Sequence, residues 1–513
     1  MTLPARARLY NDVMKRRWTL RPAAVVIALT GAMAVLLLSC GGDGSFLPSL
    51  TSLFARRCAV PRPGIDAQGS LADEKAWLRL WTDELYLWYR EVPNANPASY
   101  ATPRDYFDVL KTTAVTPSGN PKDRFHFNIP TAQWEALSQS GVQVGYGGIQ
   151  WVVVAPRPPR EVRAAYIDPG SPTQANIGRG ATVLTVDAVD VTNGADVATL
   201  NAGLFPVAAS QTHTFSILDF GTTTPRTVVL TSANVQSTPV QNVKTFGSVG
   251  YMLFNDHIAT SEALLIQAIG QLKQAQPAIT DLVLDIRYNG GGFLAIASEL
   301  AFMIAGPAAT NGKTFELLAF SDKYPSTDPV AGRPLTPEPF LGTAVGLSAP
   351  RGQALPSLGL GRVFVLTGPG TCSASESIIN GLRGIDVQVI QIGSPTCGKP
   401  YGFYPADNCG TTYFSIQFKG VNAKGFGDYP DGFVPNGSGV AGVPGCQVAD
   451  DFGHALGDAA EARLSAALGY AAGQPCPPAT FAQASQQTAL AAPARSDELV
   501  VKSPWRENRI LRR

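Results

Sequence analysis

Histidine is scarce in this chain, which has four in 513 residues. Zinc sites in proteins are built mainly from clustered histidine and cysteine side chains, and no cysteine pair here has zinc-finger spacing. The four histidines stand singly along the chain: they are His126, His213, His257 and His454. The sequence therefore argues against a metal site built on histidine, and we expect neither a metal ion nor an organic cofactor.

Charge is sparse as well. Charged residues make up 15% of the chain and nearly cancel, which leaves a net charge of +1. Binding to nucleic-acid phosphates needs a concentrated basic surface, so we expect no nucleic-acid partner. The chain is long enough for two or three domains, and its 51 glycines and 40 prolines indicate many turns.

The N-terminal residues have the pattern of an export signal. Lys15–Arg17 is basic, and the apolar stretch that follows, Ala23–Leu38, is short for a membrane span. Leu37-Leu38-Ser39-Cys40 resembles the lipobox of bacterial lipoproteins, in which cleavage leaves the cysteine as a lipidated N-terminus. We therefore expect a signal peptide over residues 1–39 and a lipid on Cys40. An uncleaved anchor helix and a plain secretory signal are the alternatives.

Lipidation would place the protein in the cell envelope, at the periplasmic face, with residues 40–66 as a tether. Gly41 and Gly42 follow the cysteine and no aspartate does, which is typical of sorting to the outer membrane. We expect the membrane to be a partner through the lipidated N-terminus.

Export also affects the other six cysteines, because disulfides persist in an oxidising compartment. Their connectivity does not follow from the sequence. We favour Cys397 with Cys409, which would close a short loop beside Lys399. The full set is Cys58, Cys372, Cys397, Cys409, Cys446 and Cys476.

A helical N-terminal domain is expected over residues 67–135. Apolar and aromatic residues recur at helical spacing in Leu71–Tyr89, and Tyr106–Leu110 continues the pattern. Such an aromatic stripe is more often packing than a cofactor site.

Residues 138–235 change to short β-rich segments, such as Trp151–Val154 and Thr227–Leu230. Within them, Val144–Ile149 resembles the carboxylate-binding loop of PDZ domains. Consecutive N–H groups of such a loop capture a C-terminal carboxylate, while the peptide adds as a strand to a sheet edge. The resemblance implies a PDZ-like domain whose peptide-binding residues are Gly145, Tyr146, Gly147 and Gly148.

The rest of this region resembles PDZ domains less uniformly. Gly170–Gly178 and Leu184–Val191 fit the pattern, but Gly180-Ala181 stands where the family often has Gly-Asp. A plain β-rich insert with an ordinary glycine turn is the alternative.

From about residue 245 the sequence alternates between strand and helix patterns. The apolar runs Leu282–Ile286 and Val363–Thr367 predict buried strands, followed by helices over Phe293–Ile304 and Ser375–Leu382. Repeated strand–turn–helix units predict an α/β core with catalytic groups at the strand ends. We interpret Pro307–Pro356 as an insertion or long loop that could cover the cleft. Residues 477–513 are expected to form a flexible tail.

The chemistry is carried by a serine and a lysine that follow the second buried run. Ser373 lies among small residues in Thr371–Ser377, and Lys399 lies in a glycine turn. A serine hydroxyl needs a base to take its proton, and a lysine can serve if burial lowers its pKa from about 10.4. Upstream, Asp285–Gly292 ends in three glycines that could direct N–H groups at an oxyanion. The pattern indicates a hydrolase with a serine–lysine dyad.

Taken together, these motifs and the PDZ-like region resemble the carboxyl-terminal processing (tail-specific) serine peptidases. The resemblance covers about residues 67–476 and implies a crotonase-like α/β peptidase core over 245–476. It implies that Ser373 is the nucleophile and Lys399 the base, with Ala374 and Gly291 supplying the N–H groups of the oxyanion hole. The implied activity is cleavage, through an acyl-enzyme, of proteins and peptides recognised by their C-terminal ends.

One position departs from that family. Phe403 stands where a glutamine usually follows the base by four residues, so we expect Asn408, Gln417 or a backbone carbonyl to orient Lys399. We expect Glu376 to cap the helix or orient the serine.

Two more predictions concern the charged turn and the histidines. Asp285 and Arg287 are expected to form a salt bridge that organises the turn, and His257 is a minor candidate base. Two other functions stay open: a non-catalytic PDZ-type peptide-binding lipoprotein, and an acyl-CoA enzyme of the crotonase type. The serine–lysine pair and the export signal argue against the second.

Overall fold

The computed structural model describes residues 50–169, 176–478 and 509–510. The expected signal peptide, Cys40 and the first part of the tether lie outside these residues, and so does most of the predicted tail. Across the described ranges, no helix is both long and apolar enough to cross a membrane.

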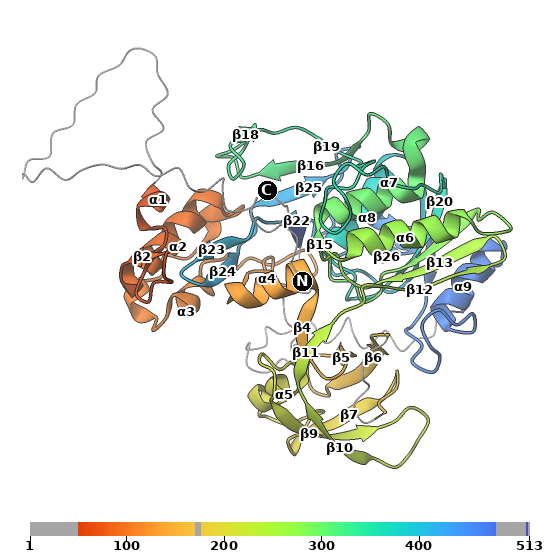
Figure 1. Ribbon diagram of the computed structural model, residues 1–513, viewed down its shortest axis with the longest axis horizontal. Coiled ribbons are helices and arrows are strands. Elements are labelled where there is room, and N and C mark those ends of the chain that lie inside the picture. The colour runs from red at the N-terminus through yellow and green to blue at the C-terminus, as the bar shows by residue number, and fades with distance from the viewer. Residues whose placement is uncertain (1–49, 170–175, 479–508, 511–513) are drawn as a thin grey trace, which may run out of the picture. The chain divides into compact units, whose positions relative to one another are not determined.

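The largest sheet has six strands in the order β12-β13-β14-β20-β21-β28 (Figure 1). The edge strand β12 pairs antiparallel with β13, and the other pairs are all parallel. The bounds are Val240–Phe246 for β12, Val249–Phe254 for β13, Asp281–Asp285 for β14, Arg362–Thr367 for β20, Gln388–Gly393 for β21 and Gly445–Gln447 for β28.

Helices cover both faces of this sheet, which explains the apolar runs in the sequence. In β14, Leu282 and Leu284 belong to the cluster formed with α6, α7 and α8, whereas Val283 belongs to the cluster that contains Leu464 of α9. Side chains alternate between the faces of a strand, so a strand buried on both faces must be apolar throughout. The predicted α/β core is confirmed. The helices are α6 (Ser261–Lys273), α7 (Leu294–Thr310), α8 (Ala374–Gly384) and α9 (Ala462–Ala471).

Apolar residues recur at helical spacing over Leu456–Tyr470, but the last helix begins later than this pattern predicts. The pattern starts at Leu456, but α9 starts at Ala462 because Glu461 caps it: the Glu461 side chain accepts a hydrogen bond from the Leu464 N–H at 3.0 Å. An N-cap residue keeps non-helical backbone angles, so the segment before it stays outside the helix.

The N-terminal region is helical, as expected, and is tied to distant parts of the chain. Its main helix, α2 (Leu71–Leu85), packs stacked Trp77 and Trp81 rings against Tyr413 and neighbouring residues. Its last strand, β3 (Phe127–Pro130), pairs with β24 (Thr411–Phe414). The short helices are α1 (Leu50–Phe54), α3 (Pro103–Phe107) and α4 (Thr131–Ser140).

The described residues between 149 and 231 form a separate antiparallel sheet and one helix, α5 (Val197–Leu204). Its strands follow the order β10-β9-β7-β6-β5, and β5 lies at one end with β6 as its partner. A ribbon of β4 and β11 joins this sheet to the neighbouring segments (Figure 1). The bounds are β4 Val142–Gly145, β5 Ile149–Ala155, β6 Glu161–Ile167, β7 Thr182–Val186, β8 Val189–Asp190, β9 Thr212–Leu218, β10 Arg226–Thr231 and β11 Ala233–Gln236.

The segment expected to be an insertion or long loop contains ordered structure. It begins inside α7 and continues as β16 (Thr314–Phe320), which pairs with β25 (Phe418–Val421) in a four-stranded sheet. The part near residues 345–349 is fixed to helices: buried Glu299 accepts from the Val345 N–H, and buried Glu262 accepts from three further N–H groups. Proline and glycine content suggested a loop because it does not reveal such long-range pairing. The other strands are β17 (Thr327–Asp328), β18 (Arg333–Pro334), β19 (Glu338–Pro339) and β22 (Tyr401–Gly402).

All six cysteines outside the export signal form disulfides, and the expected Cys397–Cys409 pair is wrong. Cys409 lies in the turn between β23 (Ala406–Asn408) and β24, on the sheet that includes β3 of the N-terminal region. That places it against Cys58 rather than against Cys397. The pairs are Cys58–Cys409, Cys372–Cys397 and Cys446–Cys476.

Candidate active site

Ser373 occupies the turn between the end of β20 and the first residue of α8. Its backbone angles, φ 62° and ψ −117°, lie in a region that residues other than glycine rarely adopt. Such strain persists where the surrounding structure enforces it, and it is concentrated at active sites. The side chain is fully buried, and its Oγ has no hydrogen-bond partner within the described residues. A strained, buried hydroxyl without a partner is well suited to meet a substrate.

Ala374 is the first residue of α8. The N–H groups of the first helical turn have no partner inside the helix, and the helix dipole favours negative charge at that end. Ala374 is also fully buried. The residue after the serine therefore offers an N–H where an oxyanion would form.

The triple glycine follows β14 and lies beside His257. Gly291 and Gly292 have φ of 99° and 139°, and a Cβ on Gly292 would lie 2.4 Å from the His257 carbonyl oxygen. The Phe293 N–H donates to the same oxygen at 2.8 Å, and the His257 N–H donates to the Gly291 carbonyl at 3.1 Å. Only glycine can bring its backbone this close to the backbone of His257. Gly292 and Phe293 form the short strand β15 (Gly292–Phe293) there.

Asn289 organises this loop, a role that the sequence reasoning missed. Its Oδ1 accepts from the Gly291 N–H and lies 3.0 Å from His257 Nδ1, and its Nδ2 donates to the Phe254 carbonyl at 2.9 Å. The Gly291 N–H is therefore engaged with Asn289 in this structure. The only signal in the sequence was the position of Asn289 directly before the glycines.

Asn289 also connects the glycine loop to the serine turn. Its carbonyl oxygen accepts from the Cys372 N–H and from the Ser375 hydroxyl, each at 3.0 Å. The two elements that the sequence proposed for one site, the glycine turn and the serine motif, are therefore in direct contact.

His257 is neutral in this arrangement. Complete burial lowers its pKa to about 3, although the hydrogen bond with Asn289 opposes that shift. Its contacts hold the glycine loop, so its observed role is structural.

Lys399 is fully buried between two aromatic rings. Its Nζ lies 4.5 Å from the ring centroid of Phe403 and 4.8 Å from that of Phe125. Burial disfavours an ammonium ion, whereas aromatic faces favour it. Phe403, which stands where the family usually has a glutamine, thus contacts the Lys399 amine through its ring. The two polar candidates make other contacts: Asn408 accepts from the Arg56 N–H, and Gln417 accepts from the Tyr404 N–H.

Glu376 joins the serine turn to the lysine turn. Its Oε2 accepts from the Ser373 N–H at 2.9 Å and the Lys399 N–H at 2.8 Å, and its Oε1 accepts from the Gly398 N–H at 2.8 Å and the Thr396 hydroxyl at 2.5 Å. Burial raises the pKa of Glu376, and these donors oppose the rise. Both oxygens are occupied by donors, so the geometry matches the orienting role expected from the sequence.

A disulfide joins the same two turns covalently. Cys372 precedes the serine and Cys397 lies two residues before the lysine, with their Cα atoms 5.1 Å apart. Together with Glu376, this bond brings Ser373 and Lys399 into one buried region. The hydrogen bond between Ser373 Oγ and the lysine amine is not formed in this structure.

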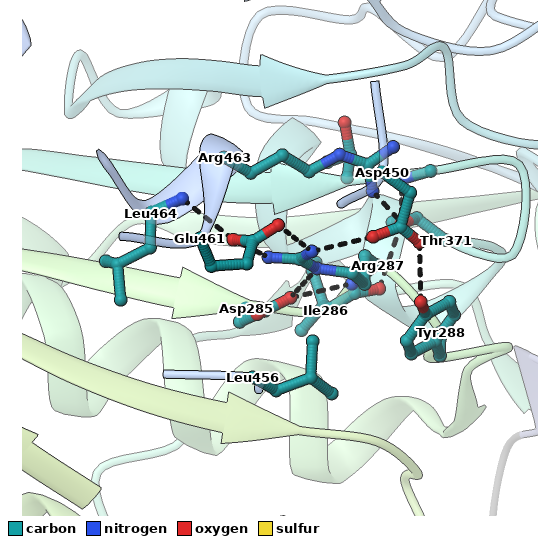
Figure 2. A network of polar contacts seen from close by, with 12 residues as sticks. Asp285, Ile286, Arg287, Tyr288, Thr371, Asp450, Leu456, Glu461, Arg463 and Leu464 are labelled. Carbon is teal, nitrogen blue, oxygen red and sulfur yellow. Dashed lines mark hydrogen bonds and ion pairs between the residues drawn. The ribbon is translucent and has the colours of Figure 1, made fainter. Parts of the chain in front are cut away.

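Arg287, which lies between β14 and the triple glycine, stands at the centre of a second polar network (Figure 2). Its guanidinium contacts Asp285 at 2.9 Å, Glu461 at 2.7 Å and Asp450 at 2.9 Å. The predicted Asp285–Arg287 salt bridge is confirmed. Two more residues of the network were not foreseen because they lie more than 160 positions away in the chain.

Asp450 links this network to the β-rich region. Arg179, which precedes β7, donates to Asp450 at 2.8 Å and to the Tyr288 hydroxyl at 2.7 Å. Burial opposes ionisation of Asp450, but the guanidinium groups of Arg463, Arg287 and Arg179 hold its pKa well below the usual range. The β-rich region and the glycine loop therefore share one partly buried carboxylate.

The expected peptide-binding loop forms a glycine turn at the start of β5. Gly147 and Gly148 have positive φ, 56° and 81°. Tyr146 points into the core of this sheet, where its hydroxyl donates to the Gly203 carbonyl at 2.6 Å. The side chain of Tyr146 is therefore used for packing, and Gly147 and Gly148 are buried beside it.

Comparison with known families identifies the domain that holds the serine and the lysine. Residues 248–402 match the family model described as Peptidase family S41, and residues 73–125 match the one described as Peptidase S41 N-terminal domain. The chain carries the domains of peptidase family S41. A chain with these two domains is a serine peptidase, and the resemblance found in the motifs is confirmed.

Several solved structures are similar to this chain, and the first of them agrees with the fold. A protein from Bacteroides fragilis assigned to the S41 proteases is 22% identical, with a TM-score of 0.55 over 77% of this chain and 97% of that one. A photosystem II D1 C-terminal processing protease is 20% identical, with a TM-score of 0.41 over 71% of this chain and 92% of that one. Mature CPAF in complex with lactacystin is 10% identical, with a TM-score of 0.40 over 71% and 92%. No curated protein matches this chain.

Proposed function

We propose that this serine peptidase is an endopeptidase of the C-terminal processing type that works through a Ser373–Lys399 dyad. The observation that carries the proposal is the double link between the two turns. Glu376 accepts from the N–H groups of both residues, and the Cys372–Cys397 disulfide joins the same turns. A nucleophile and a base held to each other in a buried site fit acyl transfer.

In this mechanism, neutral Lys399 takes the proton of Ser373 as Oγ attacks the carbonyl carbon of a peptide bond. The lysine then gives that proton to the leaving amine, and water hydrolyses the ester. The Ser373 hydroxyl turns toward the amine once substrate is bound, because catalytic hydrogen bonds often tighten only in the complex.

The oxyanion would be held by the N–H groups of Ala374 and Gly291. In the resting structure the Gly291 N–H is bonded to Asn289, so substrate must draw it toward the oxyanion. Loss of one such donor typically costs about 3–4 kcal/mol of transition-state stabilisation.

We propose that residues 138–235 act as a PDZ-like module beside a crotonase-like core. The end strand β5 can accept an added peptide strand, and the Gly145–Gly148 turn at its start offers backbone N–H groups to a C-terminal carboxylate. Arg179 connects the module to the glycine loop through Tyr288 and Asp450. Substrates would thus be recognised by their C-terminal ends.

The deciding experiment uses the soluble form that begins after Cys40. Wild type, Ser373→Ala and Lys399→Ala are incubated with an unfolded protein in the presence of a metal chelator. Cleavage by wild type and none by either variant supports the dyad. If wild type cleaves nothing between pH 6 and 9 but binds C-terminal peptides, the protein is a peptide-binding lipoprotein instead.

We also propose that the peptidase is anchored in the cell envelope by a lipid on Cys40, facing the periplasm. The support is the lipobox pattern Leu37-Leu38-Ser39-Cys40. Full-length protein made in a bacterium with labelled fatty acid should carry the label, and Cys40→Ser should not. An unlabelled wild-type protein in the soluble fraction would contradict the anchor.

A further inference from the structure

Arg124 belongs to the N-terminal region but lies against the turn that holds Lys399. It comes shortly before β3, and its guanidinium donates a hydrogen bond from Nη2 to the carbonyl oxygen of Cys397, which is 273 positions away in the chain. Cys397 comes two residues before the lysine. The end of the S41 N-terminal domain, which matches over residues 73–125, is therefore in direct contact with the turn of the proposed base.

The ring of Phe125 is shared by two cations. The guanidinium carbon of Arg124 lies 5.0 Å from the centre of this ring, and Lys399 Nζ lies 4.8 Å from the same point. The two charged groups are therefore at most about 10 Å apart. Phe125 is buried, so part of the space between the two charges is low-dielectric protein rather than water.

The segment that carries Arg124 and Phe125 is held in place by Asp123. The buried Asp123 carboxylate accepts from the Phe125 N–H at 3.0 Å and from the Tyr86 hydroxyl at 2.6 Å. The Tyr86 oxygen in turn accepts from the Thr112 N–H at 3.1 Å. Buried polar networks of this kind rigidify the residues that they join. The fold thus fixes the backbone that carries Arg124 beside the lysine turn.

Carboxylates near the lysine turn act in the opposite sense to Arg124, since a nearby negative charge favours the ammonium form of a lysine. Glu376 contacts the turn directly, through the Lys399 N–H at 2.8 Å. In the strand that follows, burial raises the pKa of Tyr401 to about 12, three carboxylates add to the rise, and Arg124 opposes it. The three carboxylates are Asp428, Asp123 and Asp431.

Two further titratable groups close to these residues are neutral near pH 7. Burial holds the pKa of Tyr429 well above its usual range and lowers the pKa of His126 to about 4. Lys122, in the same segment as Arg124, is paired with Glu91 at 2.7 Å. Arg124 is thus a cation that faces the proposed base through a shared ring and offsets part of the effect of the carboxylates.

We propose that Arg124 is a positioning residue that keeps the proposed base neutral: its charge disfavours the ammonium form of Lys399 across the Phe125 ring. The inference rests on the proposed function, because Lys399 must be the base. A lysine in water has a pKa of about 10.4, so a lysine base depends on whatever destabilises its ammonium form. A guanidinium is suited to this task because it stays protonated at every working pH. The N-terminal domain would therefore take part in catalysis.

The size of the effect follows from the separation of the charges. Arg124 is half-buried, so an effective dielectric constant between about 20 and 40 applies. At about 10 Å, a unit positive charge then lowers the pKa of the lysine by about 0.6 to 1.2. Loss of the charge should raise the pKa by the same amount, and a higher pH is then needed to neutralise the amine.

The test compares two substitutions at this position in the soluble peptidase that begins after Cys40. Arg124→Lys keeps a cation and a donor, whereas Arg124→Gln keeps a donor but no charge. With an unfolded protein as substrate, the acid limb of the kcat/KM profile should move up by about 0.6 to 1.2 pH units in Arg124→Gln and stay within about 0.3 of wild type in Arg124→Lys. A limb that stays in place in Arg124→Gln would overturn the proposal, even if kcat falls.

Arg383 provides a matched control for the loss of one positive charge. It is half-buried, donates to two backbone carbonyls and lies over two aromatic rings. It stands in the last turn of α8, roughly 15 Å along the helix from Ser373. Arg383→Gln should leave the acid limb within about 0.3 pH units of wild type, because the interaction weakens with distance. An equal shift in the two glutamine variants would assign the effect to net charge and refute the role of Arg124.

The amine can also be titrated without cleavage. The Ser373→Ala protein is made with isotope-labelled lysine, and the NMR signal of Lys399 is assigned by its loss in Ser373→Ala/Lys399→Ala. The midpoint of its titration should rise by about 0.6 to 1.2 pH units when Arg124→Gln is added, and should stay in place when Arg124→Lys is added. A midpoint that Arg124→Gln does not move would refute the electrostatic role.

This inference and the proposed function fail in different ways. If Lys399→Ala still cleaves the unfolded protein, the dyad is refuted, and the catalytic part of the inference is refuted with it. If Lys399→Ala is inactive but Arg124→Gln moves neither the acid limb nor the midpoint, the dyad stands and the role of Arg124 is refuted.

Discussion

The Cys372–Cys397 disulfide is expected to contribute both to stability and to catalysis, and its removal beside a matched control measures the two effects separately. The change is the double variant Cys372→Ala/Cys397→Ala. The chain offers a matched control in Cys446→Ala/Cys476→Ala, because the two bonds close loops of similar length, with sequence separations of 25 and 30. One bond flanks the proposed dyad and the other does not.

The loop lengths give the expected loss of stability. In the chain-entropy description, a loop of 25 residues corresponds to about 3.5 kcal/mol at 25 °C, and the longer loop to about 0.2 kcal/mol more. Both variants should therefore lose similar stability, measured as the fall in Tm. In each pair one cysteine is buried, so the loss of packing is also comparable.

The expected effects on activity differ. Without the bond, the serine turn and the lysine turn are still joined by Glu376, so the site is loosened rather than broken. A misplacement of about 1 Å can cost about 100-fold in rate, so we expect kcat to fall about 10- to 100-fold in the active-site variant. The control should stay within about twofold of wild type.

The assay measures cleavage of an unfolded protein at a temperature chosen well below the measured Tm of each variant. Treatment of wild type with a reductant should reproduce the loss of activity, and the active-site variant should not respond to it. Equal activity of the two double variants at matched stability would refute the claim that this bond positions the dyad.

Three further changes test other parts of the site. Glu376→Gln leaves one acceptor oxygen for three backbone N–H donors, and each donor left unsatisfied costs about 1–3 kcal/mol. In steady-state assays we therefore expect kcat to fall about 100-fold or more, with a smaller change in KM. An unchanged kcat would contradict the orienting role of Glu376. Phe403→Leu removes one of the two aromatic rings that contact the Lys399 amine. Its loss destabilises the protonated form of Lys399 by about 0.5–2 kcal/mol and so lowers the pH at which the amine becomes neutral. The acid limb of the kcat/KM profile should then move down by roughly half to one and a half pH units, and an unmoved limb would count against this contact. Asp450 has a depressed pKa in the folded protein, so its stabilising contribution is complete above the unfolded value of about 3.9 and is lost as the pH falls toward the folded value. Asp450→Asn should therefore lower Tm at pH 7 and narrow its difference from wild type in acid, whereas a constant difference would disagree with the ion pairs.

The sequence was informative where a local pattern decides the structure. Leu282 to Leu284 are apolar because both faces of β14 are covered, so periodicity alone predicted a buried strand. Ser373 and Lys399 lie in short motifs, and the S41 family follows from those motifs.

The partners of these residues could not be read in the same way, because they depend on distant pairings. Cys409 pairs with a cysteine 351 positions away, and Glu461 meets Arg287 from 174 positions away. Asn289 looked like an ordinary turn residue in the sequence. Its side chain contacts the glycine loop, however, and its carbonyl oxygen contacts the serine motif. Such roles follow from tertiary packing, on which a single sequence carries little information.

The strained backbone of Ser373 explains why these partners surround it. A positive φ at a residue other than glycine costs of order 1–3 kcal/mol and persists only when the surroundings enforce it. Three restraints act on the turn: the Ser373 N–H is bonded to Glu376, the Cys372 N–H to the Asn289 carbonyl, and the Cys372 sulfur to Cys397. Two of these restraints lead to the lysine turn and one to the glycine loop. The contacts that enforce the strain are thus the same contacts that assemble the nucleophile, the base and the oxyanion loop.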